Sequence, residues 1–243
     1  MEETTSTPTI RRSKGQLVPA IESPTYDPVL NLKREASLAG AVEVPSFRVW
    51  RSTDSVVLGK FLEPDREVNL SFAAERGVPV LRRTSGGGAV YHDLGNINYS
   101  IYLPGDRTQG FSIEKSLWLL SFPVTELLDT LGVEWSWDPP NNIYVGGAKI
   151  SGSAQARSRG RLLHHGTLLV STNLDKMHKL LKPGGRSRIA PVVNLSEVVP
   201  GMTPEGATVI LADILETYDL RYIAREECPP LSERDNRETG QVF

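Results

Sequence analysis

The stretch with the highest density of chemically useful residues covers residues 82–99, RRTSGGGAVYHDLGNINY. Two arginines precede three consecutive glycines, Gly86, Gly87 and Gly88, and a histidine, an aspartate and two asparagines follow within ten residues. Glycines leave backbone N–H groups uncovered, so such a loop can form an anion-binding concavity. An arginine guanidinium adds donors suited to phosphate or carboxylate. The pattern fits neither the P-loop nor the G-x-G-x-x-G motif, and the alternative is a surface turn with charges nearby.

A second stretch, residues 147–155 (GAKISGSAQ), places Lys149 just after a predicted hairpin turn and beside small residues. A lysine at such a turn is usually an exposed surface charge. Here the serines, glycine and alanines would let a ligand approach closely. A compact ammonium can stabilise charge that develops on a carboxylate or a phosphate. We therefore predict that Lys149 is catalytic.

The elements that position these stretches alternate between the two periodicities of strand and helix. We expect strands at 47–50, 55–58, 78–81, 96–103, 135–140, 143–145, 148–155 and 167–170. We expect helices at 31–41 (with Asp27 as N-cap), 68–76, 112–132 (kinked at Pro123), 173–181 and 203–218. The interleaving lacks regular β-α-β spacing, which favours an α+β fold, a mixed sheet flanked by helices, over a doubly wound sheet.

Length and composition indicate one globular domain with polar ends. The chain has 243 residues, 39% hydrophobic and 23% charged. We predict a disordered lead-in at 1–24, a folded domain at 25–220 and an acidic polar tail at 221–243. Neither an apolar run long enough to span a membrane nor a signal core is visible, so we predict a cytoplasmic protein without membrane contact. One cysteine, Cys228, excludes an internal disulfide framework and cysteine metal clusters.

The charges are unevenly distributed. Residues 151–190 hold eight Lys or Arg and one acid, whereas residues 203–243 hold nine acids and four arginines. A basic face beside an acidic tail predicts an acidic partner or a polyanionic substrate. The basic region contains no Phe, Tyr or Trp, which argues against single-stranded nucleic acid, since such binders stack bases on aromatic rings.

Four blocks, RRTSGGGAVYHDLGNINY, KISGSAQ, HHGTLL and VVNLSEVVPGM, resemble the lipoate–protein ligase family of the biotin/lipoyl ligase superfamily in order and spacing. The resemblance covers residues 27–220. It implies a fold similar to the catalytic domain of class II aminoacyl-tRNA synthetases. It also implies a two-step reaction. Lipoate (or octanoate) and ATP with Mg²⁺ would give an acyl-adenylate, and a lysine of a lipoyl-domain protein would then attack the adenylate.

The resemblance assigns roles to residues. Lys149 would bridge the acyl carbonyl and the α-phosphate. The residues that would bind the substrate or the adenylate are Arg83, Ser85, Gly86, Gly87, Gly88, His92, Asn96, Ser153, His165, Thr167 and Arg188. Two-residue alternation predicts that His165 and Thr167 point to the same face of a strand. For His164 and His165, structural pairing within the sheet remains an alternative.

The sequence departs from the family in three places. Asn142 stands where the family usually has an acidic residue, and an amide is a weaker Mg²⁺ ligand than a carboxylate, so the metal ligands stay unknown. The segment 181–194 is short, although Arg188 would still cover the phosphate. The chain also ends soon after its last predicted helix. We therefore expect a short form without a C-terminal accessory domain, which depends on a separate accessory protein or activates lipoate slowly.

Two other functions compete with the ligase. An octanoyl- or lipoyl-transferase needs a cysteine thiolate, but Gly184 and Asp138 stand where transferases place theirs. Cys228 lies beside two glutamates, which would raise its pKa. A non-catalytic lipoyl-binding paralogue is the other alternative. The acceptor of a ligase would be a 2-oxoacid dehydrogenase subunit, a glycine-cleavage carrier or another lipoyl protein, docked by the basic face.

Overall fold

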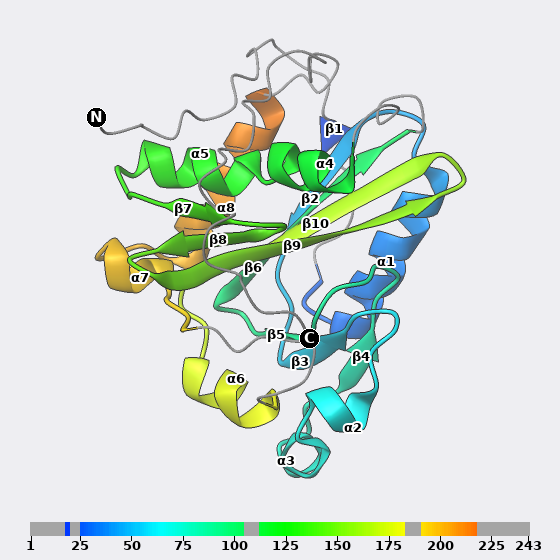
Figure 1. Ribbon diagram of the computed structural model, residues 1–243, viewed down its shortest axis with the longest axis vertical. Helices are drawn as coiled ribbons and strands as arrows, with labels where there is room; N and C mark the ends of the chain where they lie inside the picture. Colours follow the sequence, from blue (N-terminus) through cyan, green and yellow to red (C-terminus); the bar gives the residue numbers. More distant parts are fainter. Residues whose placement is uncertain (1–17, 20–24, 105–111, 183–190, 218–243) are drawn as a thin grey trace, which may run out of the picture.

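The computed structural model describes residues 18–19, 25–104, 112–182 and 191–217 (Figure 1). Arg188, Gly184 and Cys228 lie outside these ranges, as do most of the predicted lead-in and all of the predicted tail. The described residues form one large and one small sheet with helices around them, which confirms the α+β prediction. In these residues no helix is both long and apolar enough to cross a membrane.

The large sheet has seven strands and is antiparallel except for its β1–β2 pair. Its strands, in spatial order, are β1 (Val18–Pro19), β2 (Ser46–Trp50), β6 (Asn96–Leu103), β10 (Arg161–Leu169), β9 (Ala148–Ser158), β8 (Asn142–Val145) and β7 (Ser136–Asp138). The small sheet consists of β4 (Val80–Arg82), β3 (Ser55–Leu58) and β5 (Val90–His92).

Eight helices connect these strands in the described parts of the chain. They are α1 (Pro28–Ala41), α2 (Pro64–Glu67), α3 (Leu70–Glu75), α4 (Ile113–Leu120), α5 (Phe122–Thr130), α6 (Leu174–Leu180), α7 (Leu195–Val198) and α8 (Pro204–Thr217). The Asp27 side chain caps α1 by accepting from the Leu30 N–H at 2.7 Å, as the sequence predicts.

The two faces of the large sheet differ because side chains of a strand alternate between them. On β6, Ile97, Tyr99, Ile101 and Leu103 belong to the main hydrophobic core. Helices α4, α5 and α8 pack on this face (Figure 1). The intervening residues of β6 are polar at its start and face the opposite side, where α1 packs. The large sheet therefore has one purely structural face and one face that is partly free for a ligand.

The small sheet has a core of its own. Val56, Leu58 and Tyr91 of the small sheet are buried together with Met177 and Leu180 of α6. Helix α6 is joined to the α2–α3 connection by an isolated antiparallel bridge between residues 68 and 181. Helix α6 lies below the large sheet in the view of Figure 1.

The structure corrects several predicted elements. The single helix predicted from Ser112 to Gly132 is two helices, because the chain leaves helical pairing at Ser121 and Pro123 lies in the first turn of α5. A proline lacks the N–H that a helix interior needs but is tolerated in a first turn. The short helix predicted at 68–76 is α3, which begins at Leu70, and α2 before it was not predicted. Strand β10 begins at Arg161 rather than at 167, and β5 was not predicted.

Candidate active site

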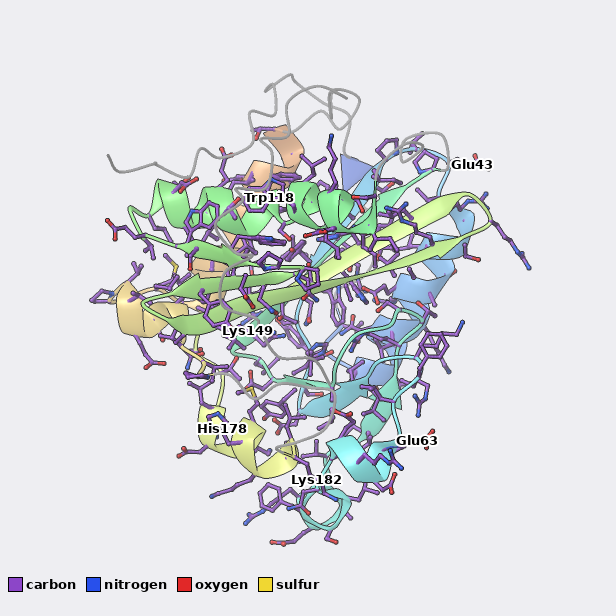
Figure 2. All side chains as sticks on the ribbon, viewed as in Figure 1. Glu43, Glu63, Trp118, Lys149, His178 and Lys182 are labelled. Atoms are coloured by element: carbon purple, nitrogen blue, oxygen red, sulfur yellow. The ribbon has the colours of Figure 1, made fainter. Side chains whose placement is uncertain are left out.

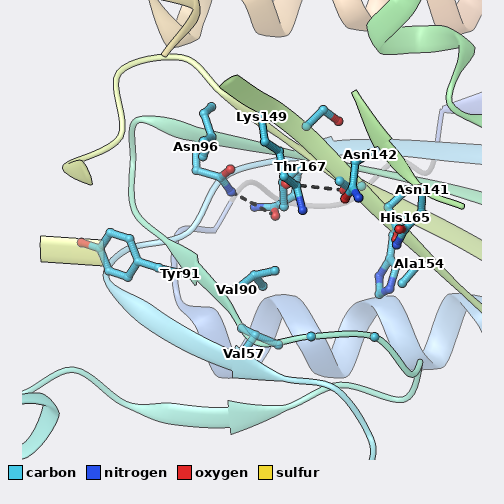
Figure 3. Close-up of a pocket in the computed structure, with 18 of the residues that line it drawn as sticks. Val57, Val90, Tyr91, Asn96, Asn141, Asn142, Lys149, Ala154, His165 and Thr167 are labelled. Carbon is cyan, nitrogen blue, oxygen red and sulfur yellow. Dashed lines mark hydrogen bonds between the residues drawn. The ribbon is translucent and has the colours of Figure 1, made fainter. Parts of the chain in front are cut away.

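A cavity of about 950 Å³ lies between the polar face of the large sheet and an opposite wall (Figure 3). This wall is formed by α1, β5, α6 and the loop of residues 86–88, called the glycine loop. Figure 3 shows Lys149, Thr167 and Asn142 on the sheet side and Val57 and Val90 on the opposite wall. The residues that line it lie between Leu32 on α1 and Val192.

Strand register builds the floor of this cavity. One row of directly paired residues crosses five strands, and its members are Trp50, Asn98, Thr167, Gly152 and Asn142. All five line the cavity, because directly opposite residues in an antiparallel sheet point to the same face. The row runs from an aromatic ring at one end to an amide at the other.

A neighbouring row, Arg48, Ser100, His165 and Ala154, forms the next step of the floor. His165 and Thr167 therefore share the cavity face, as alternation predicts. His164 points to the other face, where its Nδ1 lies 3.1 Å from the Gln155 amide nitrogen. His164 is fully buried and does not line the cavity, whereas His165 does.

Glu35, on α1, binds the residues at the end of the cavity that contains His165, which we call the deep end. Its carboxylate accepts from the Ser100 hydroxyl at 2.7 Å and from His165 Nδ1 at 3.0 Å. Because a carboxylate can only accept, His165 Nδ1 is the donor of that bond, and His165 Nε2 lies 2.7 Å from the Ser85 hydroxyl oxygen. Burial raises the pKa of Glu35, but His165, Ser100 and Arg48 together outweigh burial and hold the pKa below its ordinary value.

Arg83 shapes the glycine loop with its guanidinium. It donates to the Val57, Gly86 and Gly88 carbonyls at 3.1, 2.6 and 2.8 Å, and its Nε donates to the Ser85 hydroxyl at 2.9 Å. Four of its five donors thus bind the protein itself, and burial lowers its pKa to about 10. From the sequence, the Arg83 guanidinium is predicted to bind phosphate or carboxylate. In the structure, most of its donors instead hold the glycine loop.

Gly87 fits this arrangement because it has no side chain. Its φ is +87°, which L-residues rarely adopt, and a Cβ would stand 2.9 Å from Arg83 Nη2. The same loop approaches Gly59, where a Cβ would stand 2.0 Å from the Gly87 carbonyl oxygen. Gly87 and Gly88 line the cavity, while Ser85 and Gly86 lie behind its wall.

His92 adds an uncharged ring to the deep end. It is 5% exposed and meets the edge of Trp50, with ring centroids 5.8 Å apart. Burial, and next the positive Arg83, lower the pKa of His92 to about 3. It is therefore neutral at physiological pH and offers hydrogen bonding rather than positive charge to a ligand.

Lys149 stands at the other end of the cavity. Its backbone is fixed by bonds between its N–H and the Pro191 carbonyl (2.7 Å) and between its carbonyl and the Val193 N–H (3.1 Å). Its Nζ lies above Gly152, where a Cβ would be only 2.8 Å away. Among the residues that the structure describes, this ammonium has no hydrogen-bond partner. Burial lowers the pKa of Lys149, and the carboxylate of Asp138 acts in the opposite direction.

The predicted site residues divide into three groups. Those that line the cavity are Arg83, Gly87, Gly88, His92, Asn96, Lys149, Ser153, His165 and Thr167. The Ser153 hydroxyl, however, lies 3.4 Å from Ser121 on the helical side, so its side chain points away from the cavity floor. Ser85 and Gly86 act from behind the wall. Arg188 lies outside the described residues.

Sequence reasoning missed Glu35, Trp50, Asn98 and Asp138, which also line the cavity. Asn31 and Glu35 are four residues apart on one face of α1, and both are buried. Polar residues on the buried stripe of an amphipathic helix were the available signal. Nothing local distinguishes Asp138 or Asn98, whose positions depend on strand register.

The family described as lipoyl protein ligase A/B catalytic domain matches residues 27–215. This chain belongs to that family. The matched range contains all the residues that line the cavity, from Leu32 to Val192. It agrees with the resemblance expected from the four sequence blocks.

Curated relatives of the ligase family are similar to this chain over part of their length. The lipoate-protein ligase LplJ of Bacillus subtilis is 35% identical over 198 residues, 77% of this chain and 58% of the relative. The lipoate–protein ligase 1 of Staphylococcus aureus is 35% identical over 158 residues, 64% of this chain and 47% of the relative. The chain thus spans about half the length of the curated relatives it matches.

Solved ligase structures share the fold. One is a bipartite lipoate protein ligase from Thermoplasma acidophilum, studied with its E2 lipoyl domain. Its TM-score is 0.71 at 27% identity, and the match covers 82% of this chain and 81% of the Thermoplasma chain. LipL1 of P. falciparum, in complex with lipoate, has a TM-score of 0.68 at 30% identity over 82% and 61%. A lipoate-protein ligase A bound with ATP has a TM-score of 0.68 at 26% identity over 83% of each chain.

Proposed function

We propose that this chain is an ATP-dependent lipoate–protein ligase that activates lipoate or octanoate as an acyl-adenylate and transfers the acyl group to a lysine of a lipoyl-domain protein. The observation that carries the proposal is Lys149, a cation without a hydrogen-bond partner in the described residues, at one end of a large cavity. Lipoate and ATP are bound in two relatives of similar fold, which supports these two substrates.

The two ends of the cavity suit the two parts of an acyl-adenylate. The apolar side chains of Trp50, Val57 and Val90 and the neutral ring of His92 suit a hydrocarbon chain. Lys149 suits the carboxylate and the α-phosphate, which carry the negative charge. Asn96, on the sheet side near Lys149 in Figure 3, is proposed to bind the nucleotide.

The reaction follows from this placement. A carboxylate oxygen of the acyl substrate attacks the α-phosphorus of ATP, and pyrophosphate leaves. The acceptor lysine, as a free amine, then attacks the acyl carbonyl, and AMP leaves. Negative charge grows on the α-phosphate in the first step and on the carbonyl oxygen in the second. The Lys149 ammonium is proposed to stabilise both charges. Electrostatic stabilisation of this kind is usually the largest single contribution to catalysis.

Magnesium belongs to the proposal only as the usual companion of ATP. The described residues include no group of three or more His, Cys, Asp or Glu side chains that could hold a metal ion. The described residues alone therefore form no such metal site.

The acceptor is proposed to dock near the β9–β10 hairpin, where three arginines gather. Arg157 donates to the Ser116 hydroxyl at 2.6 Å and Arg161 donates to the Val42 carbonyl at 3.0 Å, so both also stabilise the fold. Arg159, at the hairpin turn with φ of 49°, is the better residue to test. Relatives support this class of partner, since one was studied with an E2 lipoyl domain.

The deciding test is lipoate-dependent exchange of pyrophosphate into ATP by the purified chain. We expect exchange that requires both lipoate and ATP, followed by transfer to a lipoyl domain. A folded chain that binds lipoate but gives no exchange, even with added accessory protein, would instead favour a non-catalytic lipoyl-binding protein.

Two further measurements test the remaining parts of the proposal. Exchange measured with and without an added accessory protein tests the expected dependence on one. Cell fractionation tests the cytoplasmic location.

The transferase alternative is tested in the same preparation. We expect no acyl transfer from an acyl-carrier protein without ATP, and full activity of Cys228→Ser with lipoate and ATP. Among the described residues no cysteine lines the cavity, because the only cysteine of the chain is Cys228. A thioester trapped on Cys228 would contradict the ligase proposal.

A further inference from the structure

Two nearby amides on β6, Asn96 and Asn98, carry buried polar atoms that the protein does not use. Both residues line the cavity, and they are 0% and 3% exposed. The Asn96 Nδ2 donates to the Asn98 Oδ1 at 3.2 Å. Among the described residues, the Asn96 Oδ1 and the Asn98 Nδ2 have no hydrogen-bond partner. The pair therefore offers one unused acceptor and one unused donor.

The other amides that line the cavity use their donors within the protein. In the described part of the chain these are Asn141 and Asn142. The Asn141 Nδ2 donates to the Ser153 carbonyl, and the Asn142 Nδ2 donates to the Asp138 Oδ2. A buried polar atom without a partner has lost its hydrogen bonds to water, so native proteins leave few such atoms. An unused donor and an unused acceptor side by side in a cavity wall indicate a ligand that supplies both partners.

Strand register places Asn98 between the two ends of the cavity. In the row across the floor, Asn98 directly follows Trp50 and is two strands away from Gly152. Adjacent strands are about 4.8 Å apart, so Asn98 lies about 10 Å from Gly152, above which the Lys149 Nζ stands. Figure 2 shows Lys149 on the sheet and His178 on the helix below it. An acyl chain that lies along Trp50 and reaches Lys149 with its carboxyl group therefore passes over Asn98.

The unused donor selects an oxygen of the ligand. A hydrocarbon chain cannot accept a hydrogen bond, so the acyl tail alone would leave the Asn98 amide unpaired. A carboxyl group offers acceptor oxygens, and a hydrogen bond to an ionised oxygen is stronger than one between neutral groups. The unused Asn96 acceptor suits a hydroxyl or an amino group, and ATP carries both. The pair thus matches the junction of an acyl-adenylate, where the acyl oxygens lie next to the nucleotide.

We propose that the Asn98 Nδ2 binds the carboxyl group of the acyl substrate and that Asn96 orients the Asn98 amide by bonding to its Oδ1. The inference rests on the proposed ligase function, which supplies an acyl acid as substrate. Lys149 and Asn98 then hold the carboxyl group from two sides while it attacks the α-phosphorus of ATP. In the transfer step the same amide donates to the carbonyl oxygen, on which negative charge grows. Asn98 thus determines the preference for an acid over its neutral amide, and Asn96 is a positioning residue.

The test compares lipoate with lipoamide, its neutral amide, by calorimetry on the purified full chain without ATP. Asn98→Asp keeps the acceptor that Asn96 uses but replaces the outer donor with a charged acceptor. Lipoate binding should weaken about tenfold to a hundredfold, because a bond to a charged group is lost and a like charge faces the carboxylate. Lipoamide should bind as well as before, because its NH₂ can donate to the new carboxylate.

Three further variants separate this role from a structural one. Asn194→Asp changes another buried amide, which bonds to Thr172 and does not line the cavity, and it should leave the ratio of lipoate to lipoamide affinity unchanged. Asn96→Asp cannot donate to the Asn98 Oδ1, so the Asn98 amide should turn its oxygen outward and lipoate binding should fall as in Asn98→Asp. Asn98→Ala introduces no charge and should weaken lipoate more than lipoamide, since the bond to a charged oxygen is the stronger one.

Thermal unfolding of each variant shows whether it is folded. An unchanged ratio of lipoate to lipoamide affinity in folded Asn98→Asp and Asn98→Ala would overturn the inference. Loss of stability in these variants without a change in that ratio would also overturn it, because the pair would then serve the fold. Lipoate binding by the unaltered chain without lipoate-dependent pyrophosphate exchange would contradict the ligase function instead, and the affinity ratios would still decide the role of Asn98.

Discussion

The two ends of the cavity each hold one acid and one cation, but they use them differently. At the deep end, the Arg83 donors and the Glu35 carboxylate are bound by neighbouring protein groups. At the other end, the Lys149 ammonium has no hydrogen-bond partner among the described residues. A charged side chain whose hydrogen bonds are made within the protein stabilises the local fold. A charged side chain without such partners remains available to bind a substrate.

The largest effect should follow removal of the deep-end cation. Arg83→Ala would remove the donors to three carbonyls and to the Ser85 hydroxyl, and with them a buried positive charge that interacts with Glu35. Breaking a buried, hydrogen-bonded charge network destabilises by about 3–5 kcal/mol. Urea denaturation measures this loss. Arg82→Ala is the matched control, because exposed Arg82 donates only to the Gly59 and Lys60 carbonyls and should lower stability by about 1 kcal/mol. Equal losses in both variants would show that the deep end does not depend on Arg83.

At the other end, Lys149→Ala should damage chemistry and leave stability intact. Loss of one preorganised donor to a developing anion costs about 3 kcal/mol of transition-state stabilisation, or roughly a hundredfold in rate. Pyrophosphate exchange and thermal unfolding of the same preparation separate the two effects. Lys179→Ala, an exposed lysine on α6 that does not line the cavity, is the control. Near-normal exchange by a folded Lys149→Ala protein would remove Lys149 from the reaction.

Two glycines offer a smaller and more selective comparison. A Cβ at Gly152 would meet the flexible end of Lys149 at 2.8 Å, whereas a Cβ at Gly95 would meet the Ser171 backbone oxygen at 2.3 Å. Gly152→Ala should therefore displace the ammonium and slow exchange about tenfold to a hundredfold, since a displacement of about 1 Å can cost that much. Gly95→Ala should instead lower the melting temperature. A melting temperature that falls equally in both variants would show that Gly152 serves the fold rather than the lysine.

The smallest predicted effect concerns acid. Burial, and next His165, lower the pKa of His164, so it stays neutral in the folded protein, whereas a histidine in the unfolded chain takes up a proton near pH 6.5. The unfolded state then binds more protons, and stability should fall as the pH falls below about 6.5. The slope is up to about 1.4 kcal/mol per pH unit for each such histidine. His164→Gln should flatten the dependence, measured by urea unfolding between pH 7 and pH 5. An unchanged slope would show that His164 does not carry it.

Local pattern was enough to predict the β6 strand, the hairpin before Lys149 and the shared face of His165 and Thr167. Each of these depends on near neighbours in sequence. The role of Arg83 was not visible, because a motif shows which donors a residue has but not where the carbonyls of its own loop will turn.

Long-range register explains the other omissions. Glu35 meets His165 across 130 residues, and Asn98 lies between Trp50 and Thr167 only because three strands align. Asp138 acquires its neighbour from a hairpin that closes at Pro139–Pro140. Such contacts depend on how whole elements are placed, and no single segment encodes them.

Strand β6 carries the hydrophobic core on one side and the cavity floor on the other, and the same is true of β10. Inserting or deleting one residue within either strand would turn the following hydrocarbon side chains into the cavity and send the ligand-facing ones into the core. A change of two residues keeps both sides in phase. An even change therefore preserves both surfaces, whereas an odd change needs a β-bulge, such as the irregularity between Ile143 and Tyr144 where β8 pairs with β9, to restore the phase.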